Sequence, residues 1–269
     1  MTDAPFQFFD VHVVRTERLS PTLLRATLTG DDLPRMASAG RDQRIKVFLP
    51  HPGQDAPVMP DTRGPDWYEA WRALDPDVRG IMRTYTIRAL RPGSPGSPGE
   101  LDIDFALHGT AGPASRWALT AAPGDRIGAL APVVADNVAY DFRPPAGTDW
   151  LLLAGDPSAL PAVAAILESL PAGTPVHAYL EAPHPDDHLD LPTAATAHVT
   201  WLTGTPTTDA LRTATLPDGT PYAWIAGESS AVKAIRRHLV SERGFDKRSV
   251  KFSGYWKRGT TEDQMMEAG

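Results

Sequence analysis

The sequence contains no cysteine in its 269 residues. This absence excludes disulfide bonds, zinc sites built from thiolates and iron–sulfur clusters ligated by cysteine. It does not by itself identify the cellular compartment. Because no other feature of the sequence argues against the cytoplasm, we expect a cytoplasmic protein.

Long apolar runs are missing as well. No stretch approaches the roughly 20 apolar residues that a membrane helix requires. The opening residues MTDAPFQFFD lack the basic and apolar regions of a secretory signal. A net charge of −7 argues against nucleic acid as the main partner. The hydrophobic content of 42% is sufficient for a core, so we expect a globular protein without membrane insertion.

The first half of the chain has the pattern of β-strands. Its short runs are rich in β-branched and aromatic residues, and Gly, Pro and Asp separate them. The runs are FQFFDVHVVRTERL, TLLRATLTG, RIKVFLP, RTYTIRAL, ELDIDFALHG and DRIGALAP. Six such runs predict an antiparallel barrel or sandwich. A short helix is expected in DWYEAWRALDPDVRG, between the third and fourth runs.

After residue 145 the pattern changes to alternating strands and helices. WLLLAGD is a continuous apolar run, typical of a strand that is buried on both faces, and a helical pattern follows it. Further alternation through YAWIAGE, SSAVKAIRRHLVSERG and SVKFSGYW predicts a parallel α/β sheet. We therefore expect two domains, residues 1–145 and residues 146–269.

Two strand ends of the second half carry small and acidic residues. Gly155-Asp156 follows the first predicted strand, and Gly227-Glu228 follows a later one. Ligands of doubly wound sheets bind at such carboxyl ends, where glycine allows close backbone approach. The sequence lacks GxGxxG after the first strand, and glycine also serves ordinary tight turns. Glu181 ends the second strand, where it could hold ribose hydroxyls or simply be solvated.

The strand candidate RTYTIR carries unusually many polar side chains. Alternation puts Arg83 and Tyr85 on one face and Thr84 and Thr86 on the other. A flavin dinucleotide needs a ring face, donors at its polar edge and positive charge. Tyr85, Thr86 and Arg83 could supply these, provided that Thr86 acts through its backbone or the strand twists or ends there. An edge strand with solvated arginines would look similar.

A second cluster lies about 20 residues further on, in FALHGTAGPASRWA. A strand is expected to end at His108-Gly109, and Gly112 to Ser115 to open a helix that begins near Ser115 and is capped by it. Small residues and backbone N–H groups at a helix start favour an anion. A well-capped helix with a structural histidine would have the same sequence. The HPDDH segment is interpreted as a polar loop, and no metal site is predicted.

Several motifs, taken in chain order, resemble the siderophore-interacting proteins, FAD-dependent ferric-siderophore reductases of the ferredoxin-reductase-like superfamily. They are R-x-Y-T, H-G-x-x-G-P-A-S-x-W, P-G-D, A-G-D-x-x-A-L-P-A, A-G-E and G-Y-W-[KR]-x-G. They span residues 83–259, so the resemblance covers nearly the whole chain. R-x-Y-[ST] alone marks the wider superfamily, whereas LHGTAGPASRWA together with SGYWKRG is specific. The implied fold is an N-terminal antiparallel flavin-binding β-barrel followed by a parallel α/β nucleotide-binding domain.

The resemblance also implies roles for individual residues. Those expected to bind FAD or the nicotinamide nucleotide are Arg83, Thr84, Tyr85, Thr86, His108, Gly109, Gly112, Ala114, Ser115, Gly155, Asp156, Glu181, Gly227 and Glu228. Basic side chains that would hold the anionic ferric complex are Lys46, Lys257 and Arg258. Lys46 and Lys257 could instead be solvated strand-end lysines. The family's G-P-R-G is replaced here by Ala131 to Val134, so one arginine of some relatives is missing.

The function implied is reduction of a ferric siderophore by NAD(P)H through FAD, with release of Fe(II). The flavin would do the chemistry, so no catalytic acid, base or nucleophile is predicted. Glu181 favours NADH, because a carboxylate repels a 2′-phosphate. Two alternatives are a general ferric or flavin reductase, and a flavin-containing siderophore-binding module that receives electrons from a partner such as ferredoxin. The loops at Gly155 and Gly227 favour direct use of the nicotinamide nucleotide.

Overall fold

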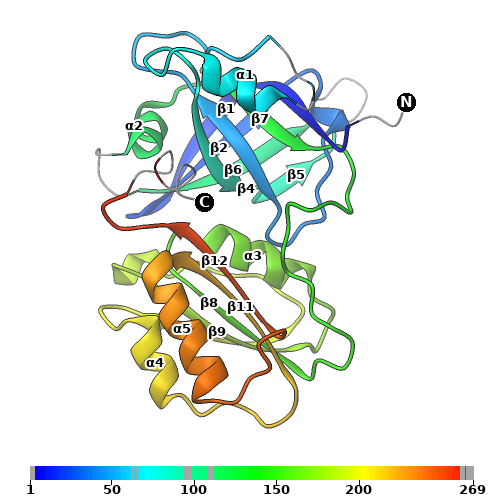
Figure 1. Cartoon of the computed structure of the whole chain (residues 1–269), viewed down its shortest axis with the longest axis vertical. Coiled ribbons are helices and arrows are strands. Elements are labelled where there is room, and N and C mark those ends of the chain that lie inside the picture. The colour runs from blue at the N-terminus through cyan, green and yellow to red at the C-terminus, as the bar shows by residue number, and fades with distance from the viewer. Residues whose placement is uncertain are drawn as a thin grey trace. The chain divides into compact units, whose positions relative to one another are not determined.

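The computed structural model describes residues 4–61, 64, 66–93, 98–107, 112–260 and 264. The chain divides into two compact units, each with its own sheet (Figure 1). The first unit comprises Met1–Leu19 and Leu23–Tyr140, and the second comprises Ser20–Thr22 and Asp141–Gly269. The assignment of FAD to residues 1–145 and of the nicotinamide nucleotide to residues 146–269 stays a prediction.

Seven strands form a curled antiparallel sheet in the first unit, in the order β4-β3-β7-β1-β2-β6-β5 (Figure 1). They are β1 (Phe6–Ser20), β2 (Leu23–Thr29), β3 (Arg44–Leu49), β4 (Ile81–Thr86), β5 (Ala89–Arg91), β6 (Glu100–Ala106) and β7 (Arg126–Pro132). The curl brings β4, at one edge, against β6, next to the other edge, where the ring centroids of Tyr85 and Phe105 are 4.5 Å apart. The predicted antiparallel barrel class is confirmed as this half-barrel.

The run RTYTIRAL, predicted as one strand, is two strands. β4 ends at Thr86 and pairs with β3, whereas β5 begins at Ala89 and pairs with β6. Between them the backbone N–H of Ile87 donates to Gln43 and that of Arg88 donates to Asp102. The chain therefore exchanges one partner strand for another at residues 87–88. Thr86 and Ile87 are both buried, so side-chain alternation breaks at this corner. The run of β-branched and aromatic residues in the sequence continues across it and does not reveal the break.

Three short helices accompany the first sheet: η1 (Leu33–Arg35), α1 (Trp67–Ala73) and α2 (Pro113–Thr120). The short helix predicted in DWYEAWRALDPDVRG is α1. Trp71 of α1 is buried, and its indole Nε1 donates to the carbonyl of Gly80 at 2.9 Å. This bond satisfies the polar atom of a side chain that otherwise packs in apolar surroundings.

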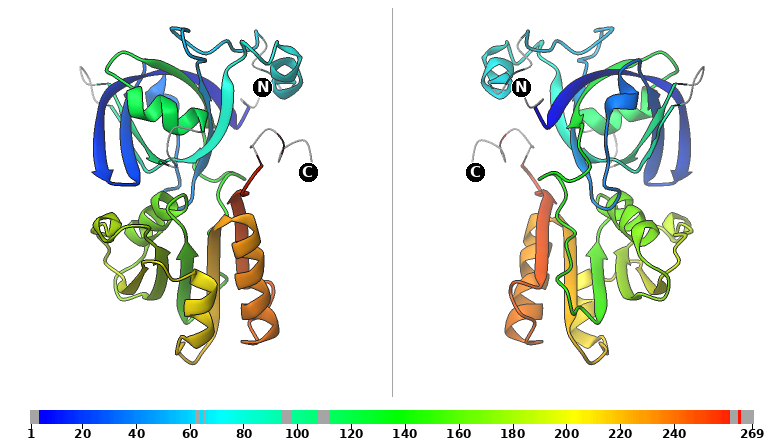
Figure 2. Two further views of the ribbon diagram at one scale, coloured as in Figure 1. Left: turned by 90° about the vertical axis from the view of Figure 1, so that its left-hand side faces the viewer. Right: turned by 90° about the vertical axis from the view of Figure 1, so that its right-hand side faces the viewer.

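Five parallel strands form the second sheet, in the order β10-β9-β8-β11-β12 (Figures 1 and 2). They are β8 (Trp150–Gly155), β9 (Pro175–Glu181), β10 (Thr196–Leu202), β11 (Pro221–Glu228) and β12 (Val250–Trp256). The helices between them are α3 (Leu160–Ser169), η2 (Pro185–Asp187), α4 (Thr207–Thr213) and α5 (Ser229–Ser241). Right-handed crossovers in this strand order put α3 on one face and α4 and α5 on the other. The predicted α/β alternation is confirmed.

Helix α5 shows how the sequence pattern produces the packing. Val232, Ile235 and Leu239 recur at helical spacing, are buried, and pack with Leu152 of β8 and Ile225 of β11. Burial of each such side chain contributes roughly 1.5–3 kcal/mol. None of the helices in the described ranges is long and apolar enough to span a bilayer.

Candidate functional site

Four of the predicted flavin-binding residues, Arg83 to Thr86, lie on β4, at the edge of the curled sheet. Lys46 of β3 is the register partner of Thr84, and its Nζ donates to Thr84 Oγ1 at 2.7 Å. Arg83 and Tyr85 flank Thr84, and both are half-buried. The structure thus brings one of the predicted substrate-binding lysines beside the predicted flavin-binding strand.

Tyr85 is fixed by an aromatic layer that continues into α2. Its ring is tilted by 45° against Phe105, which is fully buried, and Phe105 lies 5.4 Å from Trp117 of α2. Tyr85, Ala114 and Trp117 all pack against the same hydrophobic core. The predicted platform on β4 and the predicted anion site at the start of α2 are therefore mounted on one core.

Arg83 and Thr86 differ in exposure. Arg83 is half-buried, and its Nη1 donates to the carbonyl of Met82 at 2.6 Å. A guanidinium has five N–H donors in a planar fork. Thr86 is the last residue of β4 and is 5% exposed. Because the strand ends there, strict alternation does not extend past Thr86.

The start of α2 differs from the prediction. The helix begins at Pro113, and its N-cap residue is Gly112, which has no side chain with which to cap it. The predicted serine cap is wrong, because proline favours the first helical position and Ser115 is the third residue. Ser115 Oγ instead donates to the carbonyl of Ala106 at 3.3 Å. The predicted residues His108 and Gly109 lie outside the described residues.

A helix start with glycine at the N-cap has the electrostatics of an anion site. A Cβ atom built on Gly112 would meet none of the described residues within 4 Å. Backbone N–H groups in the first turn of a helix and the positive end of its dipole attract phosphate. The residues at the start of α2 fit a pyrophosphate.

In the second unit, Asp156 joins three loops at the carboxyl ends of the strands. Its Oδ1 accepts from Ser158 N at 2.9 Å and from Ser158 Oγ at 2.5 Å. Its Oδ2 accepts from Glu228 N at 2.9 Å and from Trp256 Nε1 at 2.7 Å. The strand ends of β8, β11 and β12 thus converge on one carboxylate, and both of its oxygens are engaged by the protein.

Packing within the protein explains why glycine occupies positions 155 and 227. A Cβ on Gly155 would lie 2.6 Å from the Cβ of Ala159, at the start of α3. Gly227 has φ of +139°, and a Cβ there would lie 2.6 Å from Asp156 Oδ2. Both glycines are required by the turns themselves. Their proposed contact with a nicotinamide nucleotide stays a prediction.

Glu228 is the N-cap residue of α5. Its Oε2 accepts from Ser230 N at 2.7 Å and from Ala231 N at 3.0 Å, and its Oε1 accepts from Arg258 N at 3.3 Å. Partial burial raises the pKa of Glu228, but these backbone N–H groups outweigh burial and hold that pKa below its ordinary value. The carboxylate is therefore ionised and tied to the turn after β12.

Glu181 occupies a separate position at the end of β9. Its Oε1 accepts from Thr207 N at 2.9 Å and from Thr207 Oγ1 at 2.8 Å, where α4 begins. The register of β8 and β9 pairs Gly155 with Leu180, so Glu181 lies at the same edge of the sheet as Asp156. The structure brings it to the predicted edge but gives it a structural partner there.

Lys257 and Arg258 lie in the turn that follows β12. Both are exposed, and Thr260 N closes the turn by donating to Lys257 O at 3.1 Å. Gly259 has φ of +74°, a conformation that side chains disfavour. The structure thus places two cations on a short turn next to Asp156 and Glu228.

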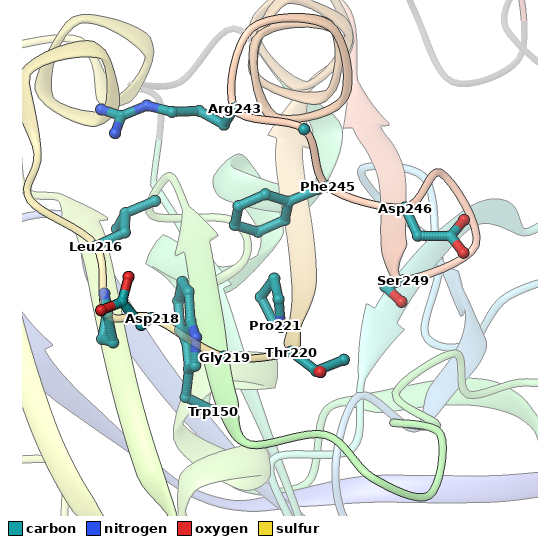
Figure 3. A pocket seen from close by; sticks show the side chains of 12 residues that line it. Trp150, Leu216, Asp218, Gly219, Thr220, Pro221, Arg243, Phe245, Asp246 and Ser249 are labelled. Carbon is teal, nitrogen blue, oxygen red and sulfur yellow. The ribbon is translucent and has the colours of Figure 1, made fainter.

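A cavity of about 350 Å³ lies at the opposite edge of the parallel sheet (Figure 3). Leu216, Phe245 and Trp150 converge in it, and Trp150 and Phe245 meet edge to face at 5.9 Å. Trp150 begins β8, whereas Gly155 ends it. Because nucleotides bind at the carboxyl ends of parallel strands, this cavity lies at the wrong edge for the predicted site.

Comparisons with known proteins match both halves of the chain. Residues 12–136 match the family model described as the siderophore-interacting FAD-binding domain, and residues 148–259 match the model described as siderophore-interacting protein. The ferric vibriobactin reductase ViuB of Vibrio cholerae is 32% identical over 262 residues, which cover 94% of this chain and 91% of the relative. The chain belongs to the siderophore-interacting protein family.

Solved structures agree with this assignment. The siderophore-interacting protein SipS from Aeromonas hydrophila superposes with a TM-score of 0.78 and 32% identity, covering 98% of this chain and 97% of that one. A ferredoxin reductase of carbazole 1,9a-dioxygenase, 18% identical, matches with a TM-score of 0.66 over 95% of this chain and 70% of that one. At that identity the likeness concerns the fold, which is therefore ferredoxin-reductase-like.

The residues of this siderophore-interacting protein suit the FAD that its domain family binds. Tyr85 presents an aromatic ring packed against Phe105, Arg83 carries a guanidinium on the same strand, and α2 begins with glycine at its N-cap. Among the residues that the structure describes, no group of histidine, aspartate and glutamate side chains could hold a metal ion.

Sequence reasoning missed two kinds of residue. Phe105 and Trp117, which support Tyr85, belong to apolar patterns that indicate only a core. Trp256 stands inside the specific motif SGYWKRG, yet its bond to Asp156 joins residues that are 100 positions apart. A tryptophan next to a basic turn was the available signal, but its partner could not be identified without the fold.

Proposed function

We propose that this protein is a cytoplasmic reductase that passes electrons from NAD(P)H through FAD to a ferric siderophore and releases Fe(II). The observation that carries the proposal is on β4, where the half-buried Tyr85 packs on the core and alternation puts Arg83 on the same side of the strand. Lys46 of β3 bonds Thr84 on the other side of the sheet. An aromatic platform and a phosphate-binding cation on one strand suit a flavin, and a cation on the neighbouring strand suits an anionic substrate. Membership of the siderophore-interacting family supports the same function.

Each residue of the first unit has a defined part in this proposal. Arg83 binds a phosphate oxygen pair through its guanidinium fork. Tyr85 contacts the flavin ring with the face that the core leaves exposed, and Thr86 serves the polar edge of the ring. The first turn of α2, from Gly112 to Ser115, neutralises the pyrophosphate through its backbone N–H groups. When bound, FAD supplies the conversion of a two-electron hydride donor into single electrons.

The second unit is proposed to bind the nicotinamide nucleotide at the carboxyl edge of its sheet. The carboxylate of Glu181 is held at this edge by Thr207. A carboxylate in that place accepts from ribose hydroxyls and repels a 2′-phosphate, which favours NADH over NADPH. Because nicotinamide nucleotides belong to the cytoplasmic pool, the proposed reaction takes place in the cytoplasm.

The substrate side of the proposal depends on charge and on the iron. Lys46, Lys257 and Arg258 attract an anionic complex to a protein whose net charge is −7. Hard, anionic oxygen ligands hold Fe(III) tightly and Fe(II) weakly, so one-electron reduction releases the metal. A hydride carries two electrons, so one nicotinamide reduces two ferric ions and one proton is set free.

The test is an anaerobic stopped-flow experiment on the full chain loaded with FAD. The flavin absorbance should fall on mixing with NADH, faster than with NADPH, and should recover on mixing with a ferric tris-catecholate. A ferric trihydroxamate, which is uncharged, serves as the comparison substrate. Reduced ferredoxin, offered in a third arm, tests the alternative donor.

Two results would overturn the proposal. If the protein stays colourless after incubation with FAD and shows no flavin spectrum, FAD is not its cofactor. If ferredoxin reduces the bound flavin but neither NADH nor NADPH does, the nicotinamide nucleotide is not the electron donor. Reoxidation by oxygen or free ferric citrate, with no reaction with either siderophore complex, would instead indicate a general ferric or flavin reductase.

A further inference from the structure

The bonds around Trp256 hold the basic turn of the second unit at two points. The indole Nε1 of Trp256 donates to Asp156 Oδ2 at 2.7 Å, and the carbonyl of Trp256 accepts from Ser229 Oγ at 2.9 Å. One residue therefore contacts the loop after β8 through its side chain and the start of α5 through its backbone. Lys257 and Arg258 follow directly, and both are exposed.

The partners of Trp256 are themselves rigid. Asp156 also accepts from its own loop through Ser158 and from Glu228 N, so its carboxylate cannot rotate without breaking several bonds. The Cβ that Gly227 lacks would overlap this carboxylate. Glu228 caps α5 and accepts from Arg258 N, which fixes the turn from its other side. The turn is thus held by a partly buried network of hydrogen bonds to other segments of the second unit.

Strand β12 needs such an anchor more than the other strands at this edge. It lies at the end of the sheet order and pairs with β11 alone, and its register with β11 shifts at Gly227 and Glu228. Backbone pairing is thus irregular where β12 ends. The charge-assisted bond from an indole N–H to a carboxylate is directional and stronger than a neutral one. It therefore determines where the turn begins.

We propose that Trp256 is a positioning residue for the substrate: through Asp156 it fixes the turn that presents Lys257 and Arg258 to an anionic ferric complex. This inference rests on the proposed function. In this assignment Trp256 acts through the cations that follow it rather than on the reacting atoms. Loss of the indole N–H leaves both cations in the chain, but the turn that carries them then adopts several conformations. Because only some of these conformations bind the complex, the affinity for it falls.

The first test is Trp256→Phe, which removes the N–H donor and keeps an aromatic side chain. The full chain loaded with FAD is reduced with NADH and mixed with a ferric tris-catecholate over a range of concentrations. The apparent KM or Kd for this complex should rise about threefold to tenfold. The rate of flavin reduction by NADH should change less than twofold. Trp201→Phe, at the end of β10, is the matched control and should leave both steps unchanged.

The second test is a double-mutant cycle, which separates positioning from a general structural effect. Lys257→Ala should weaken binding of the tris-catecholate in the parent protein, and it should weaken it clearly less when Trp256 is already Phe. Independent effects that multiply in the double variant would overturn the inference, as would an unchanged apparent KM in Trp256→Phe.

A further variant keeps the test decisive if Trp256→Phe fails to fold. Ser229→Ala removes the other anchor of Trp256 without altering the ring, and it should raise the same apparent KM about twofold, again less when Lys257 is Ala. An unchanged apparent KM in Ser229→Ala would overturn the inference. If the parent protein reduces no ferric complex, the proposed function fails first, and the inference fails with it.

Discussion

The ring of Tyr85 on β4 lies 4.5 Å, centroid to centroid, from the ring of Phe105 on β6. In the sheet order these strands are separated by β3, β7, β1 and β2, so the contact exists only because the sheet curls on itself. It leaves Tyr85 packed against the core and half-buried. The contact that closes the sheet therefore also positions Tyr85, the proposed flavin platform.

This relationship predicts separate effects for two substitutions of Tyr85. Tyr85→Phe keeps the ring and should retain FAD nearly as well as the parent protein. Tyr85→Ala removes the platform and should weaken FAD binding roughly 10- to 100-fold, the range expected for loss of one aromatic stacking partner. The measurement is a flavin fluorescence titration, together with the flavin-to-protein absorbance ratio after gel filtration.

Tyr68→Ala is the matched control for this prediction. Tyr68 is also half-buried and stacks on an aromatic neighbour, Trp71, at 5.8 Å, but it belongs to α1. The Tyr68→Ala variant should lose about as much stability as Tyr85→Ala but should retain FAD. Equal flavin content in Tyr85→Ala and Tyr68→Ala would remove Tyr85 from the cofactor site.

A second prediction concerns Lys46 and its bond to Thr84. Lys46→Met removes the charge and should raise the apparent KM for a ferric tris-catecholate about threefold to tenfold at low salt, and less at high salt, because an exposed charge is screened. Thr84→Val keeps the charge but removes the acceptor that holds the ammonium group. Its effect should have the same sign and be smaller.

Lys233→Met is the control for charge alone, because Lys233 is exposed on α5. It should leave the apparent KM unchanged. A trihydroxamate complex, which carries no net charge, should respond weakly to all three substitutions. If Lys46→Met raises the apparent KM for both complexes equally, Lys46 does not act through its charge and is not part of the proposed substrate site.

The fold could be predicted well where the pattern depends on burial. The continuous apolar run at residues 151–154 marks a strand covered on both faces, and the spacing of Val232, Ile235 and Leu239 marks the inner face of α5. Local patterns fail where a strand changes its partner within one run of strand-forming residues, as between β4 and β5. They also fail at Ser115, because proline at residue 113 decides where α2 begins.

The candidate site was predictable in its residue types and less so in its contacts. Charged and aromatic residues at strand ends stand out in the sequence, so Arg83, Tyr85, Asp156 and Glu228 could be named. Their partners could not, because each contact joins distant parts of the chain. Asp156 illustrates the difference: an acidic residue beside glycine suggests a ligand site, whereas both of its oxygens accept hydrogen bonds within the protein.

A third prediction tests the backbone beside Asp156. Gly227→Ala forces a side chain into a left-handed conformation with φ of +139° and places its Cβ against the Asp156 carboxylate. The free energy of unfolding of the second unit should fall by about 1–3 kcal/mol. Urea denaturation followed by tryptophan fluorescence measures this change.

Gly112→Ala provides the matched comparison, because Gly112 has φ of −84° and open space around its Cβ position. It should alter stability by less than about 1 kcal/mol. Equal losses in the two variants would mean that the conformation and contacts of Gly227 do not constrain the strand end.

A fourth prediction concerns acid stability and begins with Glu100. The hydrogen bond from Arg15 is the largest cause that lowers the pKa of Glu100 from its ordinary 4.5 to about 2; burial opposes the shift, and a further hydrogen bond from Arg91 adds to it. Because the pKa is lower in the folded state, the ionised carboxylate favours folding. This stabilisation is complete above pH 4.5 and is lost as the pH falls towards 2.

Glu100→Gln should therefore reduce stability at neutral pH and flatten its pH dependence between pH 4.5 and 2. The side chain of Arg15 is 53% exposed, so solvent screening limits the loss to about 1 kcal/mol. Urea midpoints measured at steps through this pH range, compared with the exposed control Glu69→Gln on α1, give the result. If the parent protein and Glu100→Gln lose stability with the same slope, the acid sensitivity of the first unit has another origin.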